Sequence, residues 1–349
     1  MSPEVILDRY IRSDMCHKRG CSGYVGKLDI DRVEPVSLRR LLRRVQSTMN
    51  EALGLEGPNA SGGVQHDPLH FDYIDVTCGT ENAHAFQHDG FAFITVTVPM
   101  VQSLWDLAGR LSRSTLVQQL LGLDTGTLQP ESLRDLLFDI QLNFLVAHEY
   151  THHVHRHNGV NDLWTAFFDD GEDGSLGLQA EELDADGYSL YLGVAYLLRG
   201  GGRPTALQQL GRTDVPGTSG DELLLTSFFL AVMAFFCSLW RGSIDMSRVY
   251  QFDHPPPPVR IKYAIQTAQM WAGQNESLPS SWFSGPRFRP LFRAAADVMG
   301  GTARQTWDAP MAFLRSSEGN RYDGQLFERF EAIRKKRDES ASPADGDPA

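Results

Sequence analysis

The sequence predicts an α+β fold that is mostly helical, with a small sheet beside a buried central helix. Long stretches carry apolar residues at helical spacing, among them 36–55, 99–121 and 131–157. Two shorter runs, 71–77 and 91–98, are rich in the β-branched and aromatic residues typical of strands. With 349 residues, 42% of them hydrophobic, the chain can bury one large core or two modest ones.

Composition and charge narrow the classes of function. The formal net charge of −12 argues against nonspecific nucleic-acid binding, which usually shows as a basic patch or stripe. Charged residues interrupt the N-terminal stretch, so it lacks the apolar core of a signal peptide. The cysteines are scattered, and Cys16 and Cys21 flank His17 too loosely to predict a zinc knuckle. We therefore expect a reduced, cytoplasmic chain.

The N-terminal third divides into a helix, a loop and strands. In 36–55 the apolar residues fall on one helical face and an arginine cluster on the other, which we interpret as a solvated face. Residues 54–68 are rich in glycine and proline and predict a loop. The strand-like runs follow, with a turn at Asp89-Gly90, and predict a small sheet or a set of hairpins.

Three regions are expected along the chain. Residues 1–70 form an N-terminal helical segment and loop, and residues 71–333 form the main domain. Residues 334–349 are rich in Asp, Ser, Pro and Ala, which predicts a disordered tail.

The central prediction concerns His148, Glu149 and His152, which form the pattern H-E-x-x-H within the apolar stretch 131–157. Positions four apart lie one turn above each other on a helix, so both imidazoles can bind one ion. Glu149 lies about 100° round the helix, beside the open coordination position. A second pair, His153 and His157, lacks the glutamate, and we interpret it as a solvated helix end.

The third ligand is expected from a predicted helix over 181–198. A catalytic zinc takes three protein ligands and one water, so a carboxylate must come from outside the first helix. Glu182 and Asp186 fall together at one border of the buried arc, whereas Glu181 points away and Asp184 borders the other side. We assign Glu182 as the ligand, and Asp186 as the acceptor of a hydrogen bond from a ligating imidazole.

Two further stretches carry alternatives. Residues 223–240 are mostly apolar and just long enough to cross a membrane, but we favour a buried core helix. In the stretch 253–261, four prolines lie between His254 and Arg260 and hold them at a fixed separation. The alternative is a proline-rich ligand for a partner protein, in which His254 and Arg260 would be incidental.

Together these motifs resemble the three-part signature of the HtpX-type and CAAX-prenyl-type zinc endopeptidases. The motifs are His148-Glu149-x-x-His152, Glu182-x-x-Ala185-Asp186 and His254-Pro-Pro with Arg260. The chain is also similar to the soluble bacterial peptidases related to the phage-exclusion protease Lit, and the resemblance covers about 74–264. The stretch Asn82-Ala83-His84-Ala85-Phe86 resembles the edge strand of the former group, although His84 interrupts the motif.

The resemblance implies a zincin-like fold and a gluzincin-type endopeptidase with Zn2+ on His148, His152 and Glu182. Asn82 to Phe86 would hold a protein or peptide substrate by backbone pairing. His84 and His88 could be extra ligands, but surface polar residues of a strand are favoured. Zinc would activate a water, Glu149 would take its proton, and His254 or Arg260 would stabilise the oxyanion.

Two other functions remain open at this point. The chain could be a zinc-binding protein that acts through contacts without catalysis, or a protease attached to a membrane through 223–240. A soluble endopeptidase is favoured, with neither a nucleic acid nor a membrane as partner.

Overall fold

The structure is mostly helical with one small mixed sheet, which confirms the predicted α+β class. The computed structural model describes residues 1–15, 24–53, 68–76, 81–123, 129–157, 172–212, 217–239, 244–273, 280–300, 308 and 310–341. The strands are β1 (Tyr24–Lys27), β2 (Leu69–Val76), β3 (Ala83–His88) and β4 (Phe91–Thr97). The α-helices are α1 (Pro3–Tyr10), α3 (Val36–Ser47), α4 (Val98–Arg113), α5 (Thr115–Leu120), α6 (Pro130–Val154), α7 (Glu172–Arg199), α8 (Gly202–Gln209), α9 (Gly217–Ser238), α10 (Pro257–Gly273), α11 (Gly285–Val298) and α13 (Ser317–Ala341).

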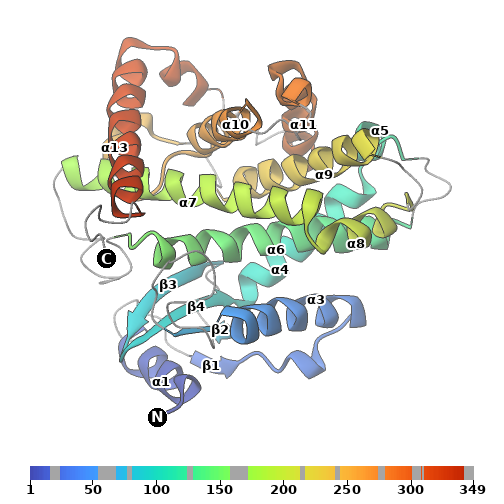
Figure 1. Cartoon of the computed structure of the whole chain (residues 1–349), viewed down its shortest axis with the longest axis vertical. Helices are drawn as coiled ribbons and strands as arrows, with labels where there is room; N and C mark the ends of the chain where they lie inside the picture. Colours follow the sequence, from blue (N-terminus) through green and yellow to red (C-terminus); the bar gives the residue numbers. More distant parts are fainter. Residues whose placement is uncertain are drawn as a thin grey trace, which may run out of the picture.

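Helices α6 and α7 run antiparallel through the middle of the molecule (Figure 1). The sheet, α1 and α3 lie on one side of this pair, and α9, α10, α11 and α13 lie on the other. The helix predicted to carry the H-E-x-x-H pattern is therefore central, with neighbours on both sides.

The sheet has the strand order β1-β2-β4-β3, with β2 and β4 parallel and the two outer pairs antiparallel. Both runs predicted as strands are present, and β3 forms a hairpin with β4. Asp89 and Gly90 join that hairpin with φ values of 48° and 77°, and such left-handed pairs match the right-handed twist of a two-residue hairpin. β3 forms the outer edge of the sheet, and the hairpin brings the chain back so that β4 lies between β3 and β2, parallel to β2.

Both faces of the sheet are covered, which explains why β4 is buried along almost its whole length. On one face, Phe86 and Phe93 pack against Leu7 and Ile11 from the N-terminal segment. On the other face, alternate residues such as Ile94 join the large core formed with the helices. Helix α3 belongs to this core as well. The boundary predicted at 70/71 falls inside β2, so residues 24–53 and the sheet form one packing unit.

Helix α6 ends earlier than the sequence predicts, in a turn that reverses the chain. Arg156 adopts a left-handed conformation with φ 53°. The amide of His157 donates to the carbonyl of His152, and the amide of Arg156 donates to that of His153. These two bonds define a Schellman motif, which satisfies the last helical carbonyls. The turn brings His157 back against the helix that it follows.

Two other predicted boundaries were wrong. Helix α7 begins at Glu172, well before 181, so the acidic residues from Glu181 onward lie inside the helix rather than in its first turn. Helix α13 continues to Ala341, so the first part of the predicted disordered tail is helical. Its Arg337 contacts Asp184 on α7, which explains why the helix persists there. Residues 342–349 lie outside the described part of the chain.

Helix α9 contains residues 223–238 of the apolar stretch predicted as a core helix, and residue 240 lies outside the described part of the chain. Within the described residues, Ser219–Ser238 is the one segment long and apolar enough to span a membrane, and 78% of its apolar window is buried inside the protein. Its side chains join the large core with α6 and α11. The structure therefore uses this helix for internal packing.

Candidate metal centre

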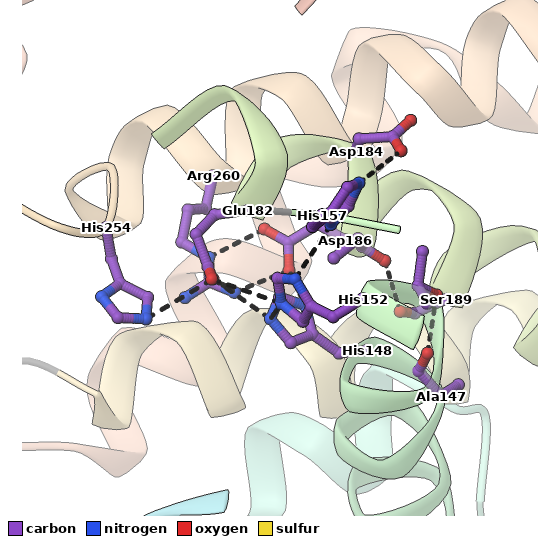
Figure 2. Close-up of polar contacts among 12 residues, drawn as sticks. Ala147, His148, His152, His157, Glu182, Asp184, Asp186, Ser189, His254 and Arg260 are labelled. Atoms are coloured by element: carbon purple, nitrogen blue, oxygen red, sulfur yellow. Dashed lines mark hydrogen bonds and ion pairs between the residues drawn. The ribbon is translucent and has the colours of Figure 1, made fainter. Parts of the chain in front are cut away.

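Three potential ligands converge where the C-terminal half of α6 passes α7. Figure 2 shows His148 and His152, one turn apart on α6, facing Glu182 on α7. Nε2 of His148 lies 3.2 Å from Nε2 of His152 and 3.1 Å from Oε2 of Glu182. Nε2 of His152 lies 3.3 Å from Oε1 of Glu182. The structure thus brings together the three ligands predicted from the sequence.

These separations fit one shared ion. Ligands placed tetrahedrally at about 2.0–2.1 Å from a zinc ion lie about 3.3 Å from one another. Oε2 of Glu182 is buried and makes no well-aligned hydrogen bond within the described residues, although His148 is at contact distance. Such atoms, close together but not aligned on each other, are expected when all of them point to a common cation. The donor set of two nitrogens and one oxygen suits a divalent transition metal.

The electrostatics of the metal-free cluster agree with a cation site. Burial would raise the pKa of Glu182, but His254 and His148 outweigh it and hold that pKa well below its usual range. Burial would lower the pKa of His148, but Glu182 and Asp186 outweigh it and raise that pKa to about 10. The carboxylate therefore keeps a positive partner inside the cluster. A metal ion that binds there has to displace a proton.

His148 is oriented by a buried ion pair behind it. Its Nδ1 lies 3.0 Å from Oδ1 of Asp186. Arg260 binds Asp186 with two contacts, Nε to Oδ2 at 2.8 Å and Nη2 to Oδ1 at 2.7 Å. Asp186 therefore lies where the sequence analysis expected an acceptor for a ligating imidazole. A ligand histidine whose other nitrogen faces a carboxylate is held in one orientation and made more basic.

His152 is oriented differently, through a second histidine. Nδ1 of His152 lies 2.9 Å from Nδ1 of His157, whose Nε2 lies 3.1 Å from Oδ2 of Asp184. Asp184 also contacts Nδ1 of His155 at 2.5 Å and Nη1 of Arg337 at 3.0 Å. His157 and Asp184 are each 3% exposed. The prediction of a solvated helix end was therefore wrong for His157, because the Schellman turn folds it back into the protein.

His153, the other member of that pair, is buried too. It faces the sheet, and its Nε2 donates a hydrogen bond of 3.0 Å to the carbonyl of Phe93 on β4. Adjacent histidines on α6 therefore have different partners, one in the ligand cluster and one in the sheet. The interpretation of His153 as solvated was also wrong, because β4 packs against the end of α6.

Glu149 lies next to His148 on α6 and is buried. Burial raises the pKa of its carboxyl group above the usual value, and His148 and His152 only partly offset this effect. A carboxylate with a raised pKa takes up a proton more readily near neutral pH, which is the property that a general base needs.

His254 and Arg260 differ in their access to this site. The side chain of His254 is 55% exposed, and its Nε2 lies 3.5 Å from Oε2 of Glu182, at the open side of the cluster (Figure 2). Arg260 is buried, and Asp186 occupies its Nε and Nη2. Of the two residues predicted as oxyanion donors, His254 has the exposed position, and Arg260 serves to hold Asp186.

The predicted substrate edge is the outer strand of the sheet. Among the described strands, β3 pairs with β4 alone, and α6 packs beside it. The positions Asn82, Ala83, His84, Ala85 and Phe86 thus lie at the sheet edge near the metal helix. His84 is buried, so its interpretation as a surface residue was wrong. Phe86 stacks on Tyr10 at 4.7 Å between ring centroids, so the N-terminal segment covers its side chain.

Two contributors to this site, His157 and Asp184, were not predicted. The sequence shows the run of histidines and places Asp184 at the border of the buried arc of α7. The turn that brings His157 to Asp184 depends on the backbone of Arg156, which the sequence pattern does not indicate.

Comparison of this chain with protein-family models, with curated proteins and with solved structures finds no match. The functional argument therefore depends on the geometry of the site.

Proposed function

We propose that this chain is a zinc-dependent endopeptidase with a zincin-like arrangement of its metal helix and sheet. The observation that supports this most directly is the ligand triangle of His148, His152 and Glu182. The two Nε2 atoms lie 3.2 Å apart, and each lies 3.1 or 3.3 Å from a different carboxylate oxygen of Glu182. Two histidines and one glutamate form one of the ligand sets of catalytic zinc, in which the fourth position is left to water or substrate.

Zinc, when bound, supplies Lewis-acid polarisation of the scissile carbonyl and lowers the pKa of a water molecule. Glu149 removes the proton from the attacking water and passes it to the leaving amine. Its buried position and raised pKa suit both steps. Asp186 and His157 hold the two imidazoles in place throughout.

Substrate approaches from the side on which His254 is exposed. An imidazole at this position donates a hydrogen bond to the carbonyl oxygen of the scissile bond, on which negative charge develops during the attack. The outer strand β3, whose ladder partner within the described sheet is β4, is the edge along which an extended peptide would pair. We propose that this edge binds the peptide. Arg260 holds Asp186 with two hydrogen bonds and lies 3.7 Å from Oε2 of Glu182, so we propose that it orients these two carboxylates and does not contact the substrate.

The test combines metal content with peptide cleavage for the unmodified chain and three variants. Glu149→Gln should keep one zinc and lose cleavage by about 10²-fold or more, because a general base contributes about 10²–10⁴-fold. Glu182→Gln should lose most of the zinc. Glu181→Gln, one position earlier on α7, is the matched control with the same change of charge and should keep both zinc and activity.

Failure would take one of two forms. Absence of zinc from the unmodified chain, or full zinc content in Glu182→Gln, would show that the ligand triangle does not bind metal. One zinc per chain without cleavage of any peptide in a mixed-sequence library would reject the peptidase and leave a metal-binding protein.

A further inference from the structure

A chain of polar contacts leads from His152 to the C-terminal helix. Asp184 lies at its centre, between His155, His157 and Arg337, with nitrogen to oxygen distances of 2.5, 3.1 and 3.0 Å respectively. His157 continues the chain to His152 through the two Nδ1 atoms, 2.9 Å apart. Figure 2 shows His157 between Asp184 and the ligand cluster.

The direction of the protons in this chain can be derived from Asp184. A carboxylate that contacts a guanidinium only accepts hydrogen bonds, so Nε2 of His157 carries the proton that it donates to Oδ2. A neutral imidazole has one N–H, so Nδ1 of His157 carries a lone pair and accepts. Nδ1 of His152 must then be the donor across the 2.9 Å contact. This leaves Nε2 of His152 with its lone pair, facing Glu182 and His148.

We infer that His157 and Asp184 are positioning residues, which fix the tautomer of His152 in which Nε2 is free to bind a metal ion. Nδ1 of His148 instead faces Asp186 directly, at 3.0 Å, so the two ligand histidines have different partners behind them. The inference rests on the metal site of the proposed function and adds to it a dependence on α13 through Arg337.

The same argument separates two groups that could each hold an ion. His155, His157 and Asp184 also bring ligand atoms within 4.8 Å of one another. An ion on Nε2 of His157 would place the proton of that ring on Nδ1, which would then donate to Nδ1 of His152. The proton of His152 would move to Nε2, and His152 could no longer bind the first ion. With neutral imidazoles, the two groups therefore exclude each other, and we assign the metal to His148, His152 and Glu182.

The first test determines the histidine tautomers in the metal-free chain and does not depend on catalytic activity. Long-range proton–nitrogen NMR spectra of the chelator-treated chain, labelled with 15N at histidine, distinguish an Nδ1–H from an Nε2–H ring. Substitution of single histidines by glutamine assigns the signals. We expect the proton of His152 on Nδ1 and that of His157 on Nε2. The reverse arrangement, with protons on Nε2 of His152 and Nδ1 of His157, would overturn the inference.

The second test measures zinc affinity and stoichiometry in variants of the chain. His157→Leu and Asp184→Asn should weaken zinc binding about 10–100-fold, the usual effect of removing a partner of a ligand histidine. His157→Gln should recover part of the affinity, because its amide can accept from His152 and donate to Asp184. Near-ultraviolet circular dichroism in chelator identifies any variant that does not fold. If His157→Leu does not fold, the zinc affinities of His157→Gln and Asp184→Asn are compared instead.

The outcomes separate this inference from the proposed function. Unchanged affinity in the His157 and Asp184 variants, or a second zinc that His155→Ala removes, would overturn the inference alone. One zinc per chain with the expected losses of affinity but no peptide cleavage would overturn the endopeptidase alone. An unmodified chain that binds no zinc would overturn both.

Discussion

Replacing Arg260 by methionine tests how far the fold depends on a single buried ion pair. Arg260 is 6% exposed and binds both carboxylate oxygens of Asp186, at 2.8 and 2.7 Å. Its guanidinium also lies 4.9 Å from the ring centroid of Phe236. Methionine keeps most of the aliphatic part of the side chain and removes the charge. Asp186 then retains the contact of 3.0 Å with Nδ1 of His148.

The expected cost follows from the charge that remains. Removing one partner of a buried ion pair costs about 3–5 kcal/mol. Without Arg260, the two buried carboxylates of Asp186 and Glu182 share the single positive charge of His148. We therefore expect Arg260→Met to lower the free energy of unfolding by about 3–5 kcal/mol. In the double variant with Asp186→Asn, neither charge remains. Its loss should be smaller than the sum of the single losses by about 1–3 kcal/mol.

The assay is urea unfolding at pH 7.5 in the presence of a chelator, so that metal binding does not add to the measured stability. Lys262→Met on the same helix is the matched control. Nζ of Lys262 lies 2.5 Å from Oδ2 of Asp323, but the lysine side chain is 38% exposed. An exposed pair of this kind contributes about 0–1 kcal/mol. The two variants remove the same charge from α10 and differ in burial.

Two results would refute this reasoning. One is a loss below about 1 kcal/mol for Arg260→Met, which would place the pair in the range of surface ion pairs. The other is strict additivity of Arg260→Met and Asp186→Asn, which would show that the two side chains do not interact.

Three further predictions concern packing, the helix end and pH. Gly193→Ala should destabilise the chain by about 1–3 kcal/mol in urea unfolding, because the new Cβ would meet the Phe228 ring at 2.6 Å. Gly177→Ala on the same helix has open space around it and should instead stabilise the chain by about 0.5–1 kcal/mol. Equal effects of the two substitutions would refute the packing argument. Arg156→Gly should be about 0.5–1 kcal/mol more stable than Arg156→Ala, because both lose the arginine side chain and only glycine adopts φ 53° without strain; equal stability of the two variants would contradict this. Burial outweighs the carboxylate of Asp184 and lowers the pKa of His157 to about 4 in the folded chain, whereas its pKa in the unfolded chain is about 6.5. As the pH falls below 6.5, the unfolded chain therefore takes up a proton at His157 that the folded chain does not. The metal-free chain should therefore lose about 2 kcal/mol more stability between pH 7.5 and 5 than His157→Gln does, and equal losses in the two chains would refute this.

The three members of the ligand triangle could be predicted because helix geometry fixes which residues share a face on each helix, although the approach of α7 to α6 is a tertiary contact. Residues four apart on α6 face the same way, and the apolar arc of α7 identifies Glu182 and Asp186 as neighbours at its border. Both arguments need only the helical period. They hold although α7 begins at Glu172, because moving the start of a helix leaves the relative positions of its later residues unchanged.

The contacts among His152, His157, Asp184 and Arg337 depend on features of the fold that the helical period of the sequence does not encode. His157 reaches His152 only because Arg156, which is not a glycine, adopts the left-handed conformation that closes the Schellman motif. Arg337 reaches Asp184 from a helix more than a hundred residues later in the chain, in a stretch whose composition is typical of disorder. Tertiary contacts override local composition in both cases.

The sheet shows the same limit. β2 and β4 were visible as β-branched and aromatic runs, but β1 was not predicted. The strand order did not follow from the sequence either, because β2 pairs with β4 and not with β3, the next strand along the chain. Because β3 lies at the outer edge, β4 becomes the neighbour of β2 and runs parallel to it.

Adjacent histidines on α6 connect the cluster of potential ligands to the sheet. His152 faces α7 and the ligand triangle, whereas His153 lies about 100° round the helix and donates to the carbonyl of Phe93 on β4. Phe93 is paired with Phe86 of β3 in the antiparallel ladder. One hydrogen bond therefore joins the helix that carries two of the ligands to the strand that positions the outer edge. Because each backbone segment in this connection is regular secondary structure, the edge and the ligand cluster are held in one orientation, as the proposed cleavage of an extended peptide would require.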